Sequence, residues 1–233
     1  MKILEKIKLK EILIFLCVIS LFYLSSYLQL IPLKFLNWDI KNISTSQAII
    51  LMTFSNLCLT IIYIIFYYNS LKKDLKTFFN NLMLNLNTAL IYWIVGIILM
   101  FVCNLIISLI NGGNIAGNEQ SVRNMISVIP SLMLVNAGIL APFNEEIIFR
   151  KSLGDIFNNK WLFVFFSFLL FGGAHVIGNI KSIIDILYIV PYGLLGASFA
   201  LAYKKTDTIF TSFTMHMVHN TLAVVLLILV GAV

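Results

Sequence analysis

Apolar runs separated by short polar segments fill almost the whole 233-residue chain. A helix rises about 1.5 Å per residue, so about 20 apolar residues cross the ~30 Å hydrocarbon core of a membrane. Runs of this length predict an all-α fold, a polytopic transmembrane helix bundle of about seven spans, within a range of six to eight. The predicted spans are Ile12–Leu33, Ser46–Tyr68, Leu82–Ile110, Met125–Phe149, Trp161–Gly178, Ile183–Tyr203 and Ile209–Val233.

Glycine and proline interrupt several of these runs. The third run is long, and we expect it to be tilted or broken near Gly96. The sixth contains Pro191, Gly193 and Gly196, which favours a kink and close helix packing. In the fifth, Gly172 and Gly173 lie one turn before His175 and allow another backbone or a substrate to approach closely.

The composition agrees with this fold and excludes others. Hydrophobic residues make up 60% of the chain and charged residues 11%, whereas soluble domains average about 45–50% and about 25%. A soluble domain would lack polar surface, and a disordered chain would not be this apolar. The net charge is +6, but no basic stripe is interleaved with aromatic residues. We therefore expect membrane lipid as a partner and no nucleic acid.

Basic residues are unevenly divided between the two sides that seven spans define. With the N-terminus in the cytoplasm, 12 of the 16 Lys and Arg residues are cytoplasmic and 4 lie outside. Because cytoplasmic loops are enriched in Lys and Arg, we predict a cytoplasmic N-terminus and an outer C-terminus. The 12 are Lys2, Lys6, Lys8, Lys10, Lys72, Lys73, Lys76, Arg150, Lys151, Lys160, Lys204 and Lys205, and the 4 are Lys34, Lys41, Arg123 and Lys181.

Two adjacent glutamates lie late in the fourth predicted span, where an ionisable side chain is costly and marks a functional site. On a helix, Glu146 and Arg150 are four residues apart and share a face, so we expect them to pair. Glu145 points about 100° away from Glu146 and is free to face another group. The alternative is a solvated helix end, because Arg150 and Lys151 mark the predicted cytoplasmic boundary.

All three histidines lie in apolar runs in the last two-fifths of the chain. His175 ends the segment FLLFGGAH in the fifth predicted span. His216 and Asn220 are four residues apart in the seventh, so an imidazole and a carboxamide can address one ligand atom. His219 lies near the same face, and a hydrogen bond to a neighbouring helix is the favoured interpretation for it.

Three short motifs in these segments resemble a known family. Residues 145–150 read EExxxR, residues 171–175 read FxxxH and residues 216–220 read HxxxN. In this order, on the C-terminal spans of a polytopic protein, they resemble the CAAX-protease and bacteriocin-processing family of intramembrane proteases, also called the Abi family. The resemblance extends from about Ala141 to Leu222, and all three motifs are intact.

The resemblance implies a proteolytic site that is sunk in the membrane and open to the cytoplasmic side. Glu145 would activate a water molecule, and His175 would help to orient or deprotonate it. His216 and Asn220 would stabilise the oxyanion. The supporting pair would be Glu146 and Arg150.

The expected function is therefore that of an intramembrane endopeptidase. Its substrate would be a small membrane-associated peptide or membrane-anchored protein, of the bacteriocin-immunity or peptide-maturation type. Because the chain is compact and rich in Ile, Asn and Lys, we expect a multi-pass protein of a bacterial cell membrane, and no prenylated substrate. Residues 1–124 would form N-terminal transmembrane helices, and residues 125–233 a catalytic transmembrane core, within one integral membrane domain.

The sequence leaves the metal question open. No cofactor is favoured, but Glu145, His175 and His216 would be the ligands if zinc binds, since two histidines and a glutamate form a known zinc set. There is no HExxH motif and no spacing fixes three ligands at once, which slightly favours a metal-independent glutamate mechanism. A serine or cysteine nucleophile is disfavoured, because the chain has no GxSxG motif.

The predicted depths of the site residues disagree. With straight helices, Glu145 would lie about 5–10 Å from the cytoplasmic boundary and His175 about 20 Å from it. The site can form only if the fifth span is tilted, starts later than predicted or unwinds near Gly172.

Two other classes of function stay open. The chain could be a non-catalytic membrane partner or regulator of a sensor kinase or bacteriocin receptor, although the intact motifs argue against this. It could also be a small proton-coupled transporter that uses Glu and His as a relay, but no inverted repeat is evident.

Overall fold

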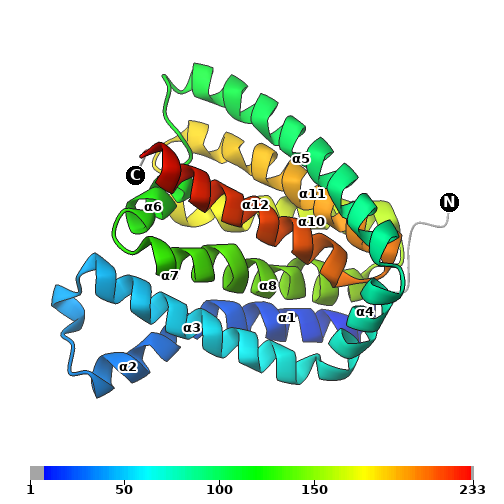
Figure 1. The fold of residues 1–233 in the computed structure, drawn as a ribbon, viewed down its shortest axis with the longest axis horizontal. Coiled ribbons are helices and arrows are strands. Elements are labelled where there is room, and N and C mark those ends of the chain that lie inside the picture. Colours follow the sequence, from blue (N-terminus) through cyan, green and yellow to red (C-terminus); the bar gives the residue numbers. More distant parts are fainter. Residues whose placement is uncertain (1–7, 232–233) are drawn as a thin grey trace.

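The computed structural model describes residues 8–231, and every regular element within that range is a helix. Seven helical segments there are long and apolar enough to cross a membrane, which confirms the predicted fold class and the number of spans. They lie side by side in one bundle and run across the view in Figure 1. The seven are Leu9–Phe35, Thr45–Phe66, Leu82–Ile110, Pro130–Ile156, Lys160–Asn179, Ile183–Thr206 and Ile209–Val230.

The orientation of the N-terminus and the division of the chain at residue 124 stay predictions. Lys2 and Lys6, which contribute to the predicted orientation, lie outside the described residues, as do residues 232–233 of the predicted seventh span.

The bundle has two distinct ends. We call one the α4 end, after the helix Tyr68–Asn80 that lies across it at the right of Figure 1. We call the other the α6 end, after the helix Gly117–Ile126 at the left, where α2 (Leu30–Phe35) also lies. The predicted cytoplasmic loops lie at the α4 end and the predicted outer loops at the α6 end.

Local sequence signals set where the helices begin and end. Ser44 and Gln47 form a capping box at the start of α3 (Thr45–Phe66), and Asn159 caps α10 (Lys160–Val176). These side chains satisfy backbone N–H groups that have no partner within the first helical turn. At the C-terminal end of α11 (Ile189–Thr206), Asp207 adopts a left-handed backbone conformation that ends the helix. The next helix, α12 (Ile209–Val230), begins two residues later.

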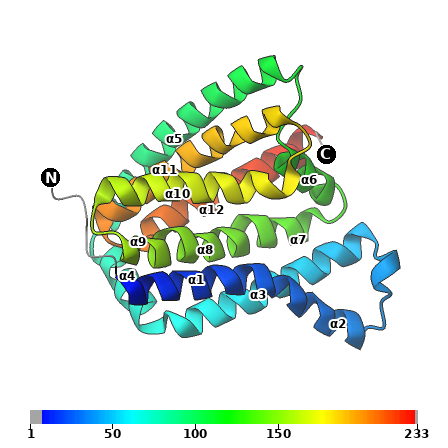
Figure 2. The same cartoon turned by 180° about the vertical axis from the view of Figure 1, so that it is seen from behind.

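The fourth span is the centre of the bundle. Buried residues make up 61% of its apolar window, against 11% for the third and seventh spans. Figure 2 shows it between α1 (Leu9–Leu24) and α10. It consists of α7 (Pro130–Val135), a π-helical turn Asn136–Leu140, α8 (Ala141–Glu146), a second π-helical turn Ile147–Ser152 and α9 (Leu153–Ile156).

The predicted limits of this span were wrong. It begins at Pro130 and continues to Ile156, seven residues past the predicted end at Phe149. Arg150 and Lys151 therefore do not mark a solvated helix end, since their exposed fractions are 0% and 9%. The polar pattern misled the prediction because both cations are neutralised inside the fold, Arg150 by Glu146 one turn earlier and Lys151 by Asp74 of α4.

The observed backbone of three other spans can be compared with the breaks, kinks and close packing predicted from glycine and proline. The third span, α5 (Leu82–Ile110), is a continuous helix, so the break expected near Gly96 is absent; this glycine instead faces Ser198 of α11 at close range. In the sixth span, Gly193 and Gly196 pack against α10, as predicted, after a 3-10 segment at Ile183–Tyr188. A 3-10 segment at Ser25–Gln29, which the sequence did not indicate, interrupts the first span.

Gly172 provides a direct test of this packing. A Cβ atom at this position would collide with the carbonyl oxygen of Ile189, a backbone atom that cannot move aside, whereas a Cβ at Gly173 would meet only Ile177 at 3.5 Å. We expect Gly172→Ala to lower the free energy of unfolding by about 1–3 kcal/mol. Gly173→Ala should be neutral or stabilising, since alanine favours a helix. Thermal unfolding of the purified variants in detergent measures both, and equal stabilities would contradict the predicted packing.

Candidate active site

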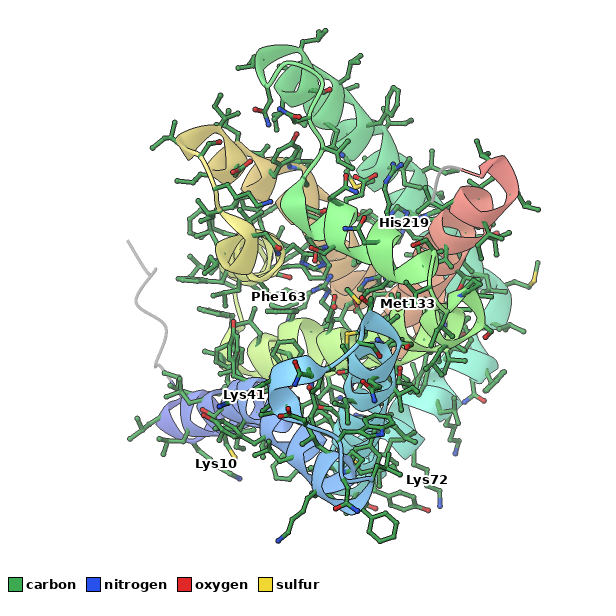
Figure 3. The ribbon with its side chains drawn as sticks, turned by 90° about the vertical axis from the view of Figure 1, so that its left-hand side faces the viewer. Lys10, Lys41, Lys72, Met133, Phe163 and His219 are labelled. Atoms are coloured by element: carbon green, nitrogen blue, oxygen red, sulfur yellow. The ribbon has the colours of Figure 1, made fainter. Side chains whose placement is uncertain are left out.

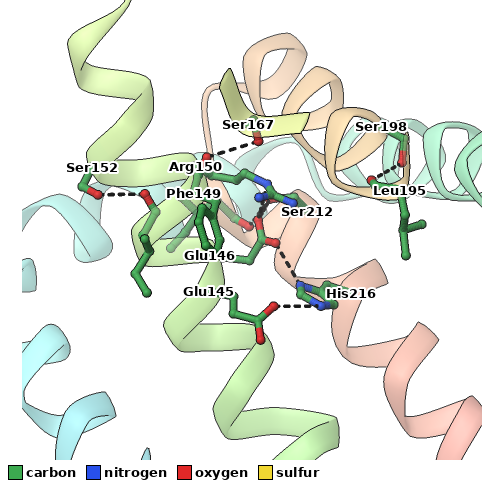
Figure 4. Close-up of polar contacts among 12 residues, drawn as sticks. Glu145, Glu146, Phe149, Arg150, Ser152, Ser167, Leu195, Ser198, Ser212 and His216 are labelled. Atoms are coloured by element: carbon green, nitrogen blue, oxygen red, sulfur yellow. Dashed lines mark hydrogen bonds and ion pairs between the residues drawn. The ribbon is translucent and has the colours of Figure 1, made fainter. Parts of the chain in front are cut away.

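Residues from all three sequence motifs meet inside the bundle. Glu145 of α8 lies between His175 of α10 and His216 of α12 (Figure 4 shows Glu145 and His216). Its Oε2 atom is 3.9 Å from Nε2 of His175 and 3.7 Å from Nε2 of His216. Both distances are too long for hydrogen bonds, and the buried Oε2 atom has no hydrogen-bond partner among residues 8–231. The structure thus holds an unpaired carboxylate oxygen facing two imidazole nitrogens.

The extended fourth span removes the conflict in depth. Glu145 stands eleven residues before Ile156, or about 16 Å along the helix, and His175 stands fifteen residues after Lys160, or about 22 Å. The α10 helix continues through Gly172 without unwinding. The expected irregularity of the fifth span was therefore unnecessary, because the error lay in the predicted end of the fourth.

Glu146 faces away from Glu145 and is fully buried in a separate polar cluster. Its Oε2 atom accepts a hydrogen bond from Oγ of Ser212 at 2.6 Å and lies 3.3 Å from Nε of Arg150. Its Oε1 atom lies 3.0 Å from Nδ1 of His216. The two adjacent glutamates thus contact opposite nitrogens of one imidazole ring, as Figure 4 shows.

Arg150 is fully buried, and aromatic rings surround its guanidinium group. The guanidinium carbon lies 4.8 Å from the ring centre of Phe171 and 5.7 Å from that of Phe199. The ring faces attract the cation in this apolar setting. Glu146 supplies the opposite charge, so the expected pairing of residues 146 and 150 is present in the structure.

The hydrogen bonds assign the protons on the two histidines. Nδ1 of His175 lies 2.8 Å from the carbonyl oxygen of Phe171, which can only accept, so Nδ1 carries the proton. Nδ1 of His216 likewise donates to the carboxylate of Glu146. In a neutral ring the Nε2 atom then carries a lone pair, and both Nε2 atoms face Glu145. Three acceptor atoms converge here, and a molecule that brings protons, such as water, complements them.

Asn220 is held by the unusual backbone of the fourth span. In the π-helical turn Asn136–Leu140, the N–H group of Ala141 binds the carbonyl of Asn136. The same register would pair the carbonyl of Ala137 with residue 142, but that residue is Pro142 and has no N–H group. Nδ2 of Asn220 donates to this free carbonyl at 2.9 Å. One N–H of the carboxamide is thereby used, and the other is left for a ligand.

His219 does not make the hydrogen bond to a neighbouring helix that the sequence favoured. Within the described residues it has no hydrogen-bond partner, and it lines a cavity of about 270 Å³ with Asn104 and Tyr192. A second cavity, of about 380 Å³, contains Glu145. His175 and Asn220 line both cavities, so the site lies between them.

Several contributors to the site were missed at the level of sequence. Ser212 is one: it precedes His216 by four residues, and this helical spacing could have revealed it. The buried ion pair between Lys151 and Asp74, at 3.1 Å, joins residues 77 positions apart in the chain, and no local signal predicts it.

Zinc ligand types are present at the site, but the arrangement of a metal site is not. A neutral imidazole with its second nitrogen hydrogen-bonded is typical of zinc ligands. Within the described residues, however, no group of three His, Cys, Asp or Glu side chains is arranged to hold a metal ion. The chemistry proposed below therefore uses only the side chains of the chain.

Replacing each glutamate by glutamine in turn distinguishes the contributions of Glu145 and Glu146 to stability. Glu146→Gln leaves Arg150 as an unpaired buried charge, so the free energy of unfolding should fall by about 3–5 kcal/mol. Glu145→Gln removes a carboxylate that has no partner and should leave stability unchanged or raise it. Thermal unfolding in detergent measures the stability of both variants. Adding Arg150→Met to Glu146→Gln should restore part of the stability that Glu146→Gln loses, because the unpaired charge is then removed as well. Equal effects of the two single changes would contradict the assigned contacts.

Comparison with known proteins bears on the same region. Residues 127–222 match the family described as "Type II CAAX prenyl endopeptidase Rce1-like". The chain is 30% identical over 117 residues to "Putative membrane peptidase YdiL" of Bacillus subtilis (strain 168), covering 49% of this chain and 44% of that protein. It is 24% identical over 139 residues to "UPF0177 protein YvdC" of Lactococcus lactis subsp. lactis (strain IL1403), covering 57% and 51% respectively.

The chain thus spans about half the length of the curated relatives that it matches. No solved structure matches it significantly. The matched residues contain all three motifs, together with Ser212. The resemblance that the motifs indicated is confirmed for this region: residues 127–222 of this integral multi-pass membrane protein are similar to the Rce1-like CAAX-protease family.

Proposed function

We propose that this protein is an intramembrane endopeptidase that hydrolyses a peptide bond with a water molecule activated by Glu145. The observation that supports this most is the unpaired Oε2 atom of Glu145, which faces two histidines in a cavity within the bundle. A carboxylate without a partner is costly in an apolar interior, so its retention at this position favours a chemical role. The family of the matched region points to the same reaction class.

In the proposed reaction Glu145 accepts a proton from water while the hydroxide adds to the carbonyl carbon of the scissile bond. His175, with its Nε2 lone pair towards Glu145, orients the water. The tetrahedral intermediate then collapses, the C–N bond breaks, and the proton taken from water passes to the leaving amine. General base catalysis of this kind contributes about 10²–10⁴-fold to a rate.

The oxyanion would be stabilised by His216 and Asn220. Asn220 has one uncommitted N–H after its bond to Ala137. His216 can donate from Nε2 when both ring nitrogens are protonated, and its Nδ1 atom is held on the carboxylate of Glu146. Donors fixed in a low-dielectric site stabilise developing charge strongly, since they need no reorientation during the reaction.

Glu146, Arg150 and Ser212 would position these groups and take no part in bond making. The fully buried cluster fixes the ring of His216 from the side opposite Glu145. The substrate would be a small membrane-associated peptide or protein, processed for bacteriocin immunity or for peptide maturation.

Replacing the proposed base tests the function directly. Glu145→Gln has nearly the same volume but cannot accept the proton of water, so cleavage should fall by at least about 10²-fold. Asn220→Ala should lower cleavage by about 10²-fold through loss of one oxyanion donor. Mass spectrometry of peptides from the membranes and medium of cells expressing wild type or variant at equal levels would identify products absent from Glu145→Gln cells.

His219→Gln serves as a control for embedded histidines in general, since His219 does not contact Glu145. Its peptide products should remain detectable. The protease proposal would be contradicted if wild type and Glu145→Gln gave identical peptide profiles at matched expression, with each protein folded. That result would favour a non-catalytic binding role.

A chelator separates the two mechanisms that the sequence left open. The purified protein in lipid nanodiscs, free of added metal, should cleave a peptide identified in that comparison equally well with and without 1,10-phenanthroline. The reason is that Glu145 and the two histidines supply base and donors by themselves. Loss of cleavage in chelator that added zinc restores would overturn the metal-independent mechanism.

A further inference from the structure

Most of the cavity that contains Glu145 lies in the half of the bundle nearer the α6 end, whereas Glu145 itself and Phe149 lie just past the middle of the fourth span. Three residues of α6 line it, together with Ser25 and Gln29 from the 3-10 segment of the first span. Met52, in the first half of α3, contributes from the same end. Figure 3 looks at the bundle from this end, with Met133, another lining residue, near its centre. Within the described residues, the route to Glu145 therefore comes from the α6 end.

The opposite half of the bundle is sealed by packed side chains. Nζ of Lys151 and Oδ2 of Asp74 form a buried ion pair at 3.1 Å. Oγ1 of the fully buried Thr208 donates to the backbone carbonyl of Asp74 at 2.9 Å, which ties α4 to the start of α12. Phe163 and Ile209 are fully buried in the same region. A substrate at the α4 end would have to break this network to reach Glu145.

Lys and Arg side chains are unevenly distributed between the two ends of the bundle. Of the described Lys and Arg residues, ten belong to the α4 end and four to the α6 end. Because the cytoplasmic side of a membrane protein is enriched in these residues, this distribution predicts that the α6 end is the extracytoplasmic one. The four are Lys34, Lys41, Arg123 and Lys181.

The lining of the cavity matches an extended stretch of peptide. Hydroxyl and carboxamide side chains come from the first, second and seventh spans and from α6, and each can both donate and accept hydrogen bonds. Backbone N–H and C=O groups of an unpaired peptide require such partners. No residue that lines the cavity is Lys or Arg, and Glu145 is there, so a terminal carboxylate would be repelled. An internal peptide bond fits better than a chain end.

From these observations we propose that the site opens to the extracytoplasmic face and receives an internal, extended peptide segment presented on that face. This differs from the cytoplasmic opening that the family resemblance implied. The inference rests on the proposed function for the nature of the cleaved bond, whereas the direction of opening depends only on the cavity and the charge distribution.

Cysteine labelling tests the direction of opening. In a background with Cys17, Cys58 and Cys103 replaced by serine, single cysteines are placed at four positions. Lys41→Cys and Lys72→Cys mark the exposed surfaces of the α6 and α4 ends, both labelled in Figure 3. Ala141→Cys lines the cavity one turn before Glu145. Its matched control in the same span is Ser152→Cys, which is 1% exposed and lies in the sealed half.

Intact cells are treated with a charged, membrane-impermeant methanethiosulfonate, before and after permeabilisation. We expect Lys41→Cys and Ala141→Cys to react in intact cells at least tenfold more than Lys72→Cys, which should react only once cells are permeabilised. Ser152→Cys should stay unreactive throughout. Reaction of Ala141→Cys only after permeabilisation, or in neither condition, would overturn the proposal.

The labelling is repeated in the presence of Glu145→Gln, and it requires no catalysis. A protein that proves not to be a protease would still give the expected labelling pattern, so the two proposals can fail separately. A reversed pattern, with Lys72→Cys reactive in intact cells, would show that the charge distribution had been misread and would also overturn outward opening.

Discussion

The buried charge of Glu146 is the constraint on which the rest of the candidate site depends. An unpaired charge in the interior of a membrane protein is very costly, so Glu146 and Arg150 must lie together, and the fold must bring a further partner to each carboxylate oxygen of Glu146. Ser212 and His216 supply those partners from α12, and Phe171 and Phe199 cover the guanidinium from α10 and α11. One ion pair therefore joins four helices and fixes the ring that faces Glu145.

The irregular backbone of the fourth span serves the same arrangement. π-helical turns on both sides of α8 change the helical register, and such turns are frequent at functional sites. Because Pro142 has no N–H group, the carbonyl of Ala137 has no backbone donor, and Nδ2 of Asn220 donates to it instead. The carboxamide is thus oriented by a hydrogen bond that an ordinary α-helix would not offer. On this basis the two glutamates and Asn220 belong to one positioned unit, in which Glu145 and Asn220 line the cavity.

The fold and much of the site could be predicted from the sequence because their signals are local. Span number follows from hydrophobic length, and the pairing of Glu146 with Arg150 follows from a four-residue spacing. Signals of this kind failed where a partner came from far along the chain. Lys151 by itself indicates a membrane boundary, but Asp74 of α4 neutralises it inside the fold. Gly96 by itself indicates a break in the helix, but in the fold the missing side chain leaves room for Ser198 of α11.

By itself the sequence determined the membrane class, the number of spans and the residues able to do chemistry, because hydrophobic length and embedded ionisable groups are visible one segment at a time. Only the tertiary structure decided which way these groups face. It turned Glu145 towards a cavity and Glu146 into a sealed cluster, and it located the opening of that cavity at the α6 end. These outcomes depend on contacts between distant spans, whose packing no local pattern encodes.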